Sequence, residues 1–320
     1  MIAPAYKGAP HCEPTMPLDL TALLALDPAR SQDGDGSIAV PRTHACPVSA
    51  RSGAPYRILV SWPEGDAPAA GWPIVYLLGS DTFLLATEML RYRAGGGTAD
   101  SLRDGIVVGI GYPAENRRVF DYTPAPLEGE PTPKQHGADA FLDFVLDDLR
   151  PAVEKVLPVD RRAQTFAGHS LGGMLVLLAM FRQPDAFQAY LASSPSVWWR
   201  GAQLLKMARD FAARGATSEA PVARLWISAG EYEQALSPAE LTENGPDIEI
   251  ARKQRDTRFM VDHNREIADA LRTRRDLRVG FRYFPGQTHR TIVPVALLAG
   301  LCATQASEWV PDKDKAWDEG

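Results

Sequence analysis

Residues 164–173 read QTFAGHSLGG, and this short stretch decides the fold. Its last six letters fit the pattern G-x-S-x-G with Ser170 at the centre. The apolar run Gln164–Ala167 precedes the motif and a helical pattern follows it, which is the strand–turn–helix context that the motif requires. A turn this tight strains the serine backbone, and small residues on either side let strand and helix approach closely. We therefore predict that Ser170 is a nucleophile at the end of a buried strand, with the N–H of Leu171 facing a developing oxyanion.

Strands and helices alternate on both sides of this turn. Several of the short apolar runs are apolar on both faces, as strands covered by helices must be. Helical patterns occur at Phe141, Val145 and Leu149, over Leu175–Phe181 and over Phe259–Leu271. We predict an α/β fold, with a mainly parallel central sheet, helices on both faces and a site at the carboxyl ends of the strands. The candidate strands are Tyr56–Trp62, Ile74–Leu78, Ile106–Ile110, Gln164–Ala167, Ala189–Ala192, Leu225–Ala229 and Val279–Phe284.

Composition narrows the class of protein. Of 320 residues, 45% are hydrophobic and 23% charged, which is ordinary for a globular protein. The 40 acidic and 34 basic residues give a net charge of −6, a sign that argues against a nucleic-acid partner. The most apolar run, Leu171–Phe181, is far shorter than a membrane span. We expect neither nucleic acid nor a membrane span among the interactions of this chain.

The chain divides into three parts by composition. Residues 1–40 are rich in Pro, Gly and Asp and form an irregular leader, 41–306 form the α/β domain, and 307–320 form an acidic tail. The leader lacks the pattern of a signal peptide. We expect a cytoplasmic protein, or a periplasmic one if the chain is a processed form.

Cofactor and metal motifs are missing from the sequence. Residues 109–114 read GIGYPA and fit G-x-G-x-x-A after a strand, but Pro113 and the polar run behind it do not support the helix that a dinucleotide site needs. There is no P-loop, no H-E-x-x-H and no C-x-x-C. We expect neither a cofactor nor a metal site.

A serine hydroxyl needs a general base, and in this topology the base follows the nucleophile in the chain. His263 and His289 lie well downstream of Ser170. His289 follows the last candidate strand in the loop 284–289, FPGQTH, where the base is needed. His263 lies inside a charged helical pattern, and His169 is expected to pack within the turn. We therefore predict His289 as the base.

The acid that orients the base should follow the strand Leu225–Ala229. The chain reads GEYE over 230–233, so Glu231 and Glu233 are both candidates, and we favour Glu233 for its spacing from the glycine. Asp256 and Asp262 are weaker candidates beside a charged helix. A Ser–His pair without a well-placed acid also remains open.

The second oxyanion donor should come from the loop after Ile74–Leu78, which reads GSDT over 79–82. We expect the backbone N–H of Ser80 or Asp81 to supply it. The Asp81 carboxylate is a poor catalytic acid, because an anion beside the oxyanion would repel it.

Several further segments carry a resemblance to a known family. They are VGIGYP at 108–113, GADAFLDF at 137–144, ASSPSVWW at 192–199 and FPG leading to His289. Together with the serine motif they make the chain, over about residues 40–303, resemble the bacterial putative-esterase family of α/β-hydrolases. Within that family it looks most like the ferric-siderophore trilactone esterases that act on enterobactin and salmochelin.

The resemblance implies a serine hydrolase that cleaves carboxylic esters through an acyl-enzyme, with Ser170 as nucleophile, His289 as base and iron arriving with the substrate. A ferric catecholate is anionic, so we expect Arg118 and Arg117 to help select it, with at least one of the two facing the pocket mouth. The aromatic rings of Tyr122, Trp198 and Trp199 are candidate surfaces for the catechol rings. The alternatives are that both arginines are solvated or pair with Glu115 and Asp121, and that the tryptophans belong to the core.

Two other functions remain open: a general acyl or feruloyl-type esterase, which would have a narrow apolar pocket, and a catalytically silent α/β-hydrolase that only binds. The chain also departs from the family pattern. Residues 79–81 read GSD where relatives commonly have DGN, Arg290 stands where they often have glycine, and the charged segment 234–258 is an insertion.

Overall fold

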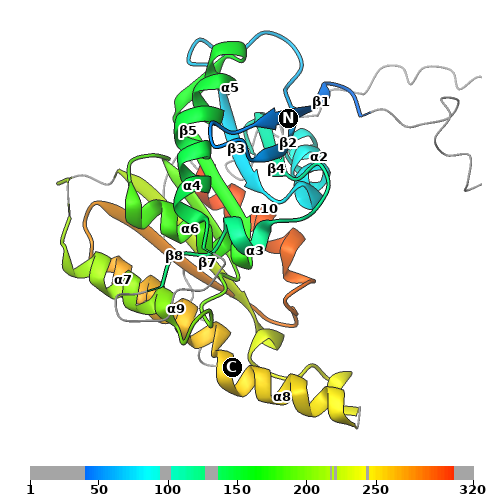
Figure 1. The fold of residues 1–320 in the computed structure, drawn as a ribbon, viewed down its shortest axis with the longest axis vertical. Coiled ribbons are helices and arrows are strands. Elements are labelled where there is room, and N and C mark those ends of the chain that lie inside the picture. Colours follow the sequence, from blue (N-terminus) through cyan, green and yellow to red (C-terminus); the bar gives the residue numbers. More distant parts are fainter. Residues whose placement is uncertain are drawn as a thin grey trace, which may run out of the picture. The chain divides into compact units, whose positions relative to one another are not determined.

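The computed structural model describes residues 40–93, 102–126, 136–216, 218–219, 222–242 and 245–305. Apart from Val40, the predicted leader (1–40) lies outside the described residues, and so does the predicted tail (307–320). The described residues form an eight-stranded sheet in the order β1-β2-β4-β3-β5-β6-β7-β8 (Figure 1). Strand β2 is antiparallel to both of its neighbours, and the remaining pairs are parallel. The strands are β1 (Thr43–Ser49), β2 (Pro55–Ser61), β3 (Trp72–Leu78), β4 (Ile106–Gly111), β5 (Val159–His169), β6 (Ala189–Ser193), β7 (Ala223–Gly230) and β8 (Leu277–Phe284).

Helices cover both faces of this sheet, which confirms the predicted fold class (Figure 1). The segments α4, η3 and α5 follow one another without a break, and η3 is a π-helical turn. The helices are α2 (Phe83–Arg93), α3 (Arg118–Asp121), α4 (Ala138–Asp143), η3 (Phe144–Leu149), α5 (Arg150–Val156), α6 (Leu171–Arg182), α7 (Gln203–Ala213), α8 (Pro246–Arg258), α9 (Met260–Arg272) and α10 (Ile292–Gln305), with the short 3₁₀ helices η2 (Ser80–Thr82), η4 (Glu231–Glu233) and η5 (Glu240–Thr242).

Strand β3 shows why the central strands are apolar throughout. Ile74, Tyr76 and Leu78 point into the larger core, which also contains α6. Val75 and Leu77 point the other way, into the core that α2 and α10 cover. Because successive side chains of a strand alternate between the faces, a strand buried on both sides needs an unbroken apolar run.

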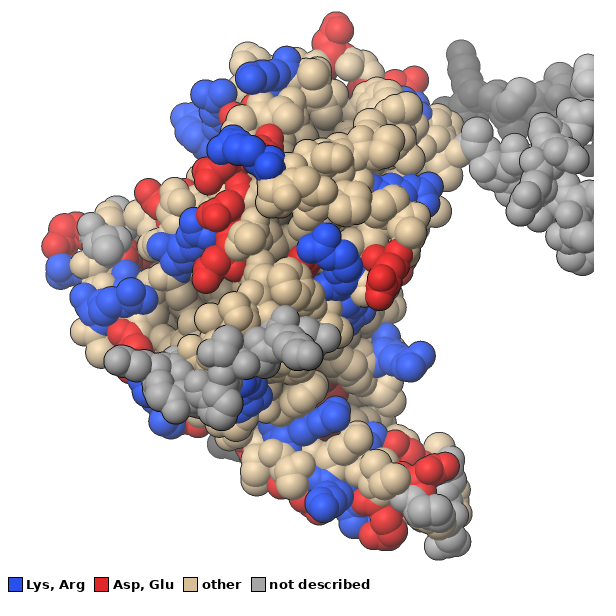
Figure 2. All heavy atoms as spheres, in the orientation of Figure 1, with Lys and Arg blue, Asp and Glu red and all other residues tan. Residues whose placement is uncertain are grey.

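Helix α8 projects from the sheet as an arm (Figure 1). Acidic and basic side chains are interspersed on the arm in Figure 2. Asp247 and Glu249 lie in its first turn and Arg255 and Arg258 in its last, a distribution that complements the helix dipole. Phe259 adopts the left-handed conformation (φ 46°, ψ 46°) and joins α8 to α9.

None of the helices in the described ranges is both long and apolar enough to span a bilayer.

Candidate active site

The turn between β5 and α6 has the conformation that the G-x-S-x-G motif predicts. Ser170 has φ 61° and ψ −120°, which is a strained backbone for a residue with a side chain. A Cβ on Gly168 would lie 2.6 Å from the backbone of Gly172, and one on Gly173 would lie 2.8 Å from the Ser193 carbonyl oxygen. The N–H of Ser170 donates to that same carbonyl at 2.9 Å. These close approaches hold the serine at the carboxyl edge of the sheet.

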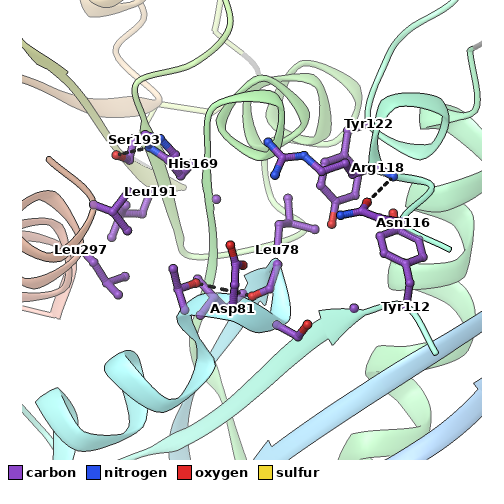
Figure 3. Close-up of a pocket in the computed structure, with 17 residues that line it drawn as sticks. Leu78, Asp81, Tyr112, Asn116, Arg118, Tyr122, His169, Leu191, Ser193 and Leu297 are labelled. Carbon is purple, nitrogen blue, oxygen red and sulfur yellow. Dashed lines mark hydrogen bonds between the residues drawn. The ribbon is translucent and has the colours of Figure 1, made fainter. Parts of the chain in front are cut away.

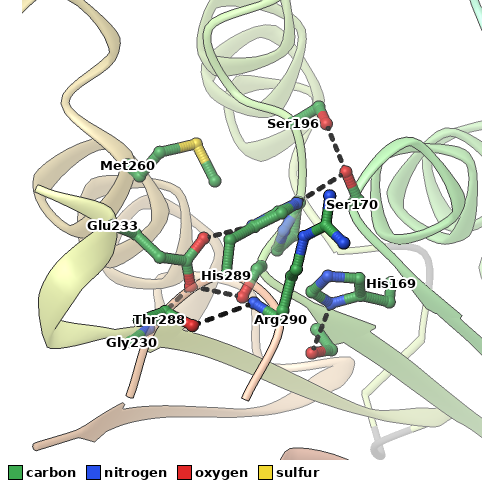
Figure 4. A network of polar contacts seen from close by, with 12 residues as sticks. His169, Ser170, Ser196, Gly230, Glu233, Met260, Thr288, His289 and Arg290 are labelled. Atoms are coloured by element: carbon green, nitrogen blue, oxygen red, sulfur yellow. Dashed lines mark hydrogen bonds and ion pairs between the residues drawn. The ribbon is translucent and has the colours of Figure 1, made fainter. Parts of the chain in front are cut away.

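Three side chains from separate loops meet at this edge (Figure 4). The His289 Nε2 lies 2.9 Å from the Ser170 Oγ, and the His289 Nδ1 lies 2.6 Å from the Glu233 Oε2. When Nδ1–H donates to the carboxylate, Nε2 is free to accept the serine proton. The arrangement can therefore generate a nucleophilic alkoxide and return its proton to a leaving group.

Glu233 is almost completely buried, with 1% of its side chain exposed. Its Oε1 accepts hydrogen bonds from the Ser194 hydroxyl at 2.6 Å and from the Gly230 N–H at 2.8 Å. Burial by itself raises the pKa of Glu233, but the bonds from His289, Ser194 and Gly230 outweigh burial and hold that pKa below its usual value. The carboxylate is thus kept ionised beside the imidazole.

Glu231 has a different position from Glu233. Its Oε2 accepts the N–H of Gly286 at 2.7 Å, in the loop that carries the histidine. The carbonyl of Gln287 in the same loop accepts the Tyr232 N–H at 2.9 Å. Glu231 therefore supports the histidine loop, and Glu233 contacts the histidine.

The two glutamates make a testable pair. We expect Glu233→Gln to lower kcat on a carboxylic ester by about 10²–10⁴-fold, because an amide cannot stabilise the imidazolium. We expect Glu231→Gln to cost less than about tenfold, since its amide oxygen can still accept the Gly286 N–H. Steady-state kinetics of both variants would test the order, and a larger loss at Glu231 would reverse the assignment.

His169 packs between the nucleophile and the neighbouring strand. Its Nδ1 lies 3.0 Å from the Ser193 Oγ, and its ring centroid lies 4.5 Å from that of His289. Burial, followed by the charge of His289, lowers the pKa of His169 to about 4. A neutral ring therefore flanks His289, where a second imidazolium would oppose proton transfer.

This shift predicts an acid-sensitive fold. Between about pH 6.5, the ordinary histidine pKa, and pH 4, unfolded His169 binds a proton that the folded form does not. The free energy of unfolding should fall as the pH drops through this window, by up to about 3 kcal/mol, and then cease to depend on His169. Urea unfolding at pH 7 and pH 4.5 would measure the loss. His169→Gln should reduce it, and an unchanged loss in this variant would contradict the prediction.

One pocket of about 220 Å³ lies beside the loop after β3. We name it the oxyanion-side pocket, because the first turn of η2 borders it and N–H groups at a helix start have no intrahelical partner. The N–H of Gly79 donates to Ile110, which leaves those of Ser80 and Asp81 as the candidate donors beside Leu171, the first residue of α6. Asp81 and Arg118 point into this pocket from different elements (Figure 3). Its lining includes Ser80, Asp81, Tyr112, Arg118, Tyr122 and His169.

A second pocket of about 290 Å³ shares no lining residue with the first and is bordered by the catalytic network itself. We name it the histidine-side pocket. The end of α8 and the start of α9 form one wall of it, so the segment expected to be an insertion contributes to the site through its last residues. Its lining includes Ser170, Trp198, Arg255, Arg258, Met260 and His289.

The residues predicted to bind substrate separate into two groups. Arg118 and Tyr122 line the oxyanion-side pocket, and Trp198 lines the histidine-side pocket. Arg117 instead forms an ion pair with Asp121 at 2.9 Å, and Asp121 is 2% exposed, which is the pairing with Asp121 expected from the sequence as the alternative. Trp198 and Trp199 both pack against the core, with ring centroids 5.7 Å apart, and of the two only Trp198 is in the lining of either pocket.

Two contributions escaped the sequence analysis. Arg258 enters the site because it is the last residue of α8, the end of the arm that borders the histidine-side pocket, and no local motif signals this. Ser194 binds Glu233 from the ASSPS segment, whose likeness to family sequences was the one available signal. The described residues hold no group of three His, Cys, Asp or Glu side chains that could bind a metal ion.

Comparison with known proteins places this geometry in context. Residues 49–276 match the model of the family described as Putative esterase. The ferri-bacillibactin esterase BesA of Bacillus subtilis is 31% identical, over 82% of this chain and 89% of the relative. The siderophore enterobactin esterase of Emericella nidulans is 34% identical, over 79% and 90%. The solved structure of the siderophore hydrolase EstB from Aspergillus nidulans is 30% identical, with a TM-score of 0.74 over 86% of this chain and 99% of that one.

Proposed function

Because this chain belongs to the Putative esterase family, we propose that it hydrolyses the ester bonds of a ferric catecholate siderophore, with Ser170 as the nucleophile. It is a carboxylic ester hydrolase of the serine type. The similar proteins named above are siderophore esterases or hydrolases, which supports a substrate of that class.

The proposed mechanism uses the groups at the carboxyl edge of the sheet. Ser170 Oγ attacks the ester carbonyl while His289 Nε2 takes its proton, and Glu233 stabilises the imidazolium. The N–H of Leu171 and one from Ser80 or Asp81 stabilise the oxyanion. His289 then gives the proton to the leaving alcohol, and a water molecule hydrolyses the acyl-enzyme by the same route in reverse.

One observation carries the choice of substrate. Arg118 lies half-buried in the oxyanion-side pocket and Arg258 in the histidine-side pocket, and neither pairs with an acidic residue of the described ranges. Half-buried guanidinium groups without counter-ions are suited to an anionic ligand, and catecholate oxygens accept their fixed N–H donors. A general acyl esterase would instead need a narrow apolar pocket. Iron enters here as part of the substrate.

The test is product analysis after incubation with ferric and with iron-free trilactone siderophore. We expect ring-opened and monomeric hydroxy acids from the wild-type chain and none from Ser170→Ala. Hydrolysis of simple acyl esters alone would identify a general carboxylesterase. Binding of the ferric siderophore without hydrolysis of any ester would identify a binding module, and either result would contradict the proposal.

The two neighbouring arginines give a matched comparison. We expect Arg118→Ala to lower kcat/KM for the ferric siderophore by about 10–100-fold, the range for a hydrogen bond to a charged group, with a much smaller loss on a small neutral ester. Arg117→Ala removes the ion-pair partner of buried Asp121 and should lower the free energy of unfolding by about 3 kcal/mol. Kinetics on both esters and urea unfolding separate these outcomes, and equal losses on both esters for Arg118→Ala would indicate a structural role.

A further inference from the structure

The two pockets differ in which groups of the site border them: Ser170 lines the histidine-side pocket, and its neighbour His169 lines the oxyanion-side pocket. His289 lines the histidine-side pocket, and the loop after β3 lines the oxyanion-side pocket. This difference matters because the two halves of an ester have different needs during the reaction.

Proton transfer determines the place of the alcohol half. His289 Nε2, which receives the serine proton at 2.9 Å, must deliver it to the leaving oxygen, and that oxygen must lie within hydrogen-bond reach of the same atom. The alcohol half therefore extends into the space that His289 borders. The carbonyl oxygen turns toward the N–H donors, and the acyl half is left with the oxyanion-side pocket.

A cation and an aromatic ring face each other in the space for the alcohol half. The Arg258 guanidinium carbon lies 4.5 Å from the centroid of the Trp198 ring. Stacking on an indole face satisfies the flat side of a guanidinium and leaves its N–H donors at the edge for an anion. Both side chains line the pocket together with His289.

Arg255, the other arginine of α8 that lines this pocket, already has hydrogen-bond and ion-pair partners. The Arg255 guanidinium pairs with Glu240 at 2.6 Å and donates to the carbonyls of Ala235 and Ala251. Arg258 has no acidic partner in the described ranges, and burial, followed by the charge of Arg255, lowers its pKa. Burial and the nearby charge of Arg255 both disfavour the charged form of Arg258, and a bound anion would offset both effects. Arg258 is therefore the cation of α8 best placed to bind substrate.

We propose that the enzyme divides its substrate by polarity, with the acyl half in the oxyanion-side pocket and the alcohol half in the histidine-side pocket, where Arg258 and Trp198 bind an anionic aromatic group carried by the alcohol. The proposal rests on the serine esterase activity proposed above and names the residues that select the leaving group. It extends to any ester whose alcohol bears such a group.

Small esters test the assignment without a siderophore. In one pair only the alcohol half differs in charge: 3-acetoxybenzoate is anionic and its methyl ester is neutral. In the other pair the acyl half differs: 4-nitrophenyl succinate is anionic and 4-nitrophenyl butyrate is neutral. We expect Arg258→Gln to lower kcat/KM for 3-acetoxybenzoate by about 10–100-fold, a loss at least tenfold larger than on the other three esters.

Trp198→Leu should reduce the same preference by removing the stacking surface. Arg252→Gln is the matched control, because Arg252 is an exposed arginine of the same helix whose Nε lies 3.8 Å from Glu249. This control should keep wild-type kinetics on all four esters. Circular dichroism would verify that each variant is folded.

Each outcome bears on the proposal. Equal losses on both members of the alcohol pair, or a selective loss on 4-nitrophenyl succinate, would overturn it. A wild-type enzyme that does not prefer 3-acetoxybenzoate to its methyl ester would overturn it too. Failure to hydrolyse a ferric siderophore while the alcohol-side preference persists would refute the proposed substrate and leave this inference standing. Failure on all four esters would overturn this inference, while the proposed function would still be decided by product analysis with the siderophore.

Discussion

Replacing Ser170 by alanine should lower kcat on any carboxylic ester by about 10⁴–10⁶-fold while leaving the fold unchanged. The substitution removes one oxygen atom, and with it the attacking atom that lies 2.9 Å from the His289 Nε2. The backbone bonds of the turn do not involve the hydroxyl, so thermal melting should be close to wild type. Initial rates with 4-nitrophenyl acetate and with the siderophore would measure the loss.

The matched control for this variant is Ser196→Ala. The Ser196 hydroxyl is buried and lies 3.3 Å from the Ser170 Oγ, so it shares the environment of the nucleophile. We expect a loss of less than about tenfold, the effect of one hydrogen bond. A folded Ser170→Ala enzyme with near wild-type turnover would mean that Ser170 is not the nucleophile. A loss of kcat that is larger for Ser196→Ala than for Ser170→Ala would mean the same.

His289→Ala should be nearly as damaging as Ser170→Ala, and the double variant should be hardly worse than either. Nucleophile and base act as one unit, so the second substitution has little left to remove. The residual rate should come from the oxyanion donors and from substrate binding. The measurement is kcat for the two single variants and the double variant on one ester under identical conditions.

His263→Ala is the control for this comparison. His263 belongs to α9, where its ring lies 5.4 Å from that of Phe259, and it makes no contact with Ser170. It should keep kcat within about twofold of wild type. Additive losses for Ser170 and His289 would show that His289 does not serve as the base.

The central strands can be predicted from the sequence because burial on both faces leaves a continuous apolar run. Strand β3 is such a case. Strand β1 was missed, because it lies at the edge of the sheet, is partly exposed and contains Pro47. Strand β5 begins at Val159, five residues before the predicted start. The predicted start is too late because Arg161 and Arg162, in the first half of the strand, are exposed and break the apolar run. Exposed positions, at a sheet edge in β1 and at the strand's start in β5, interrupt the apolar pattern on which the prediction depends.

A site residue can be predicted from the sequence when its place depends on local contacts or on strand order, and not when it depends on contacts between segments far apart in the chain. The Ser170 turn is local, and His289 follows from strand order, so both can be placed from the sequence. Spacing alone leaves Glu231 and Glu233 open, and their separation depends on hydrogen bonds to Gly286 and to His289. Arg258 cannot be predicted, because its approach depends on the end of a charged, projecting helix lying beside the site.

The left-handed joint at Phe259 also has a consequence for how this enzyme can diversify. Arg258 is the last residue of α8 and stands next to the joint, while α9 packs on the sheet beyond it. The position of Arg258 is therefore set by α9, which follows it, and not by the residues at the start of α8. Insertions or deletions toward the start of α8 would lengthen or shorten the arm without rotating this guanidinium out of the pocket. The length of the arm can thus change without displacing Arg258 from the site.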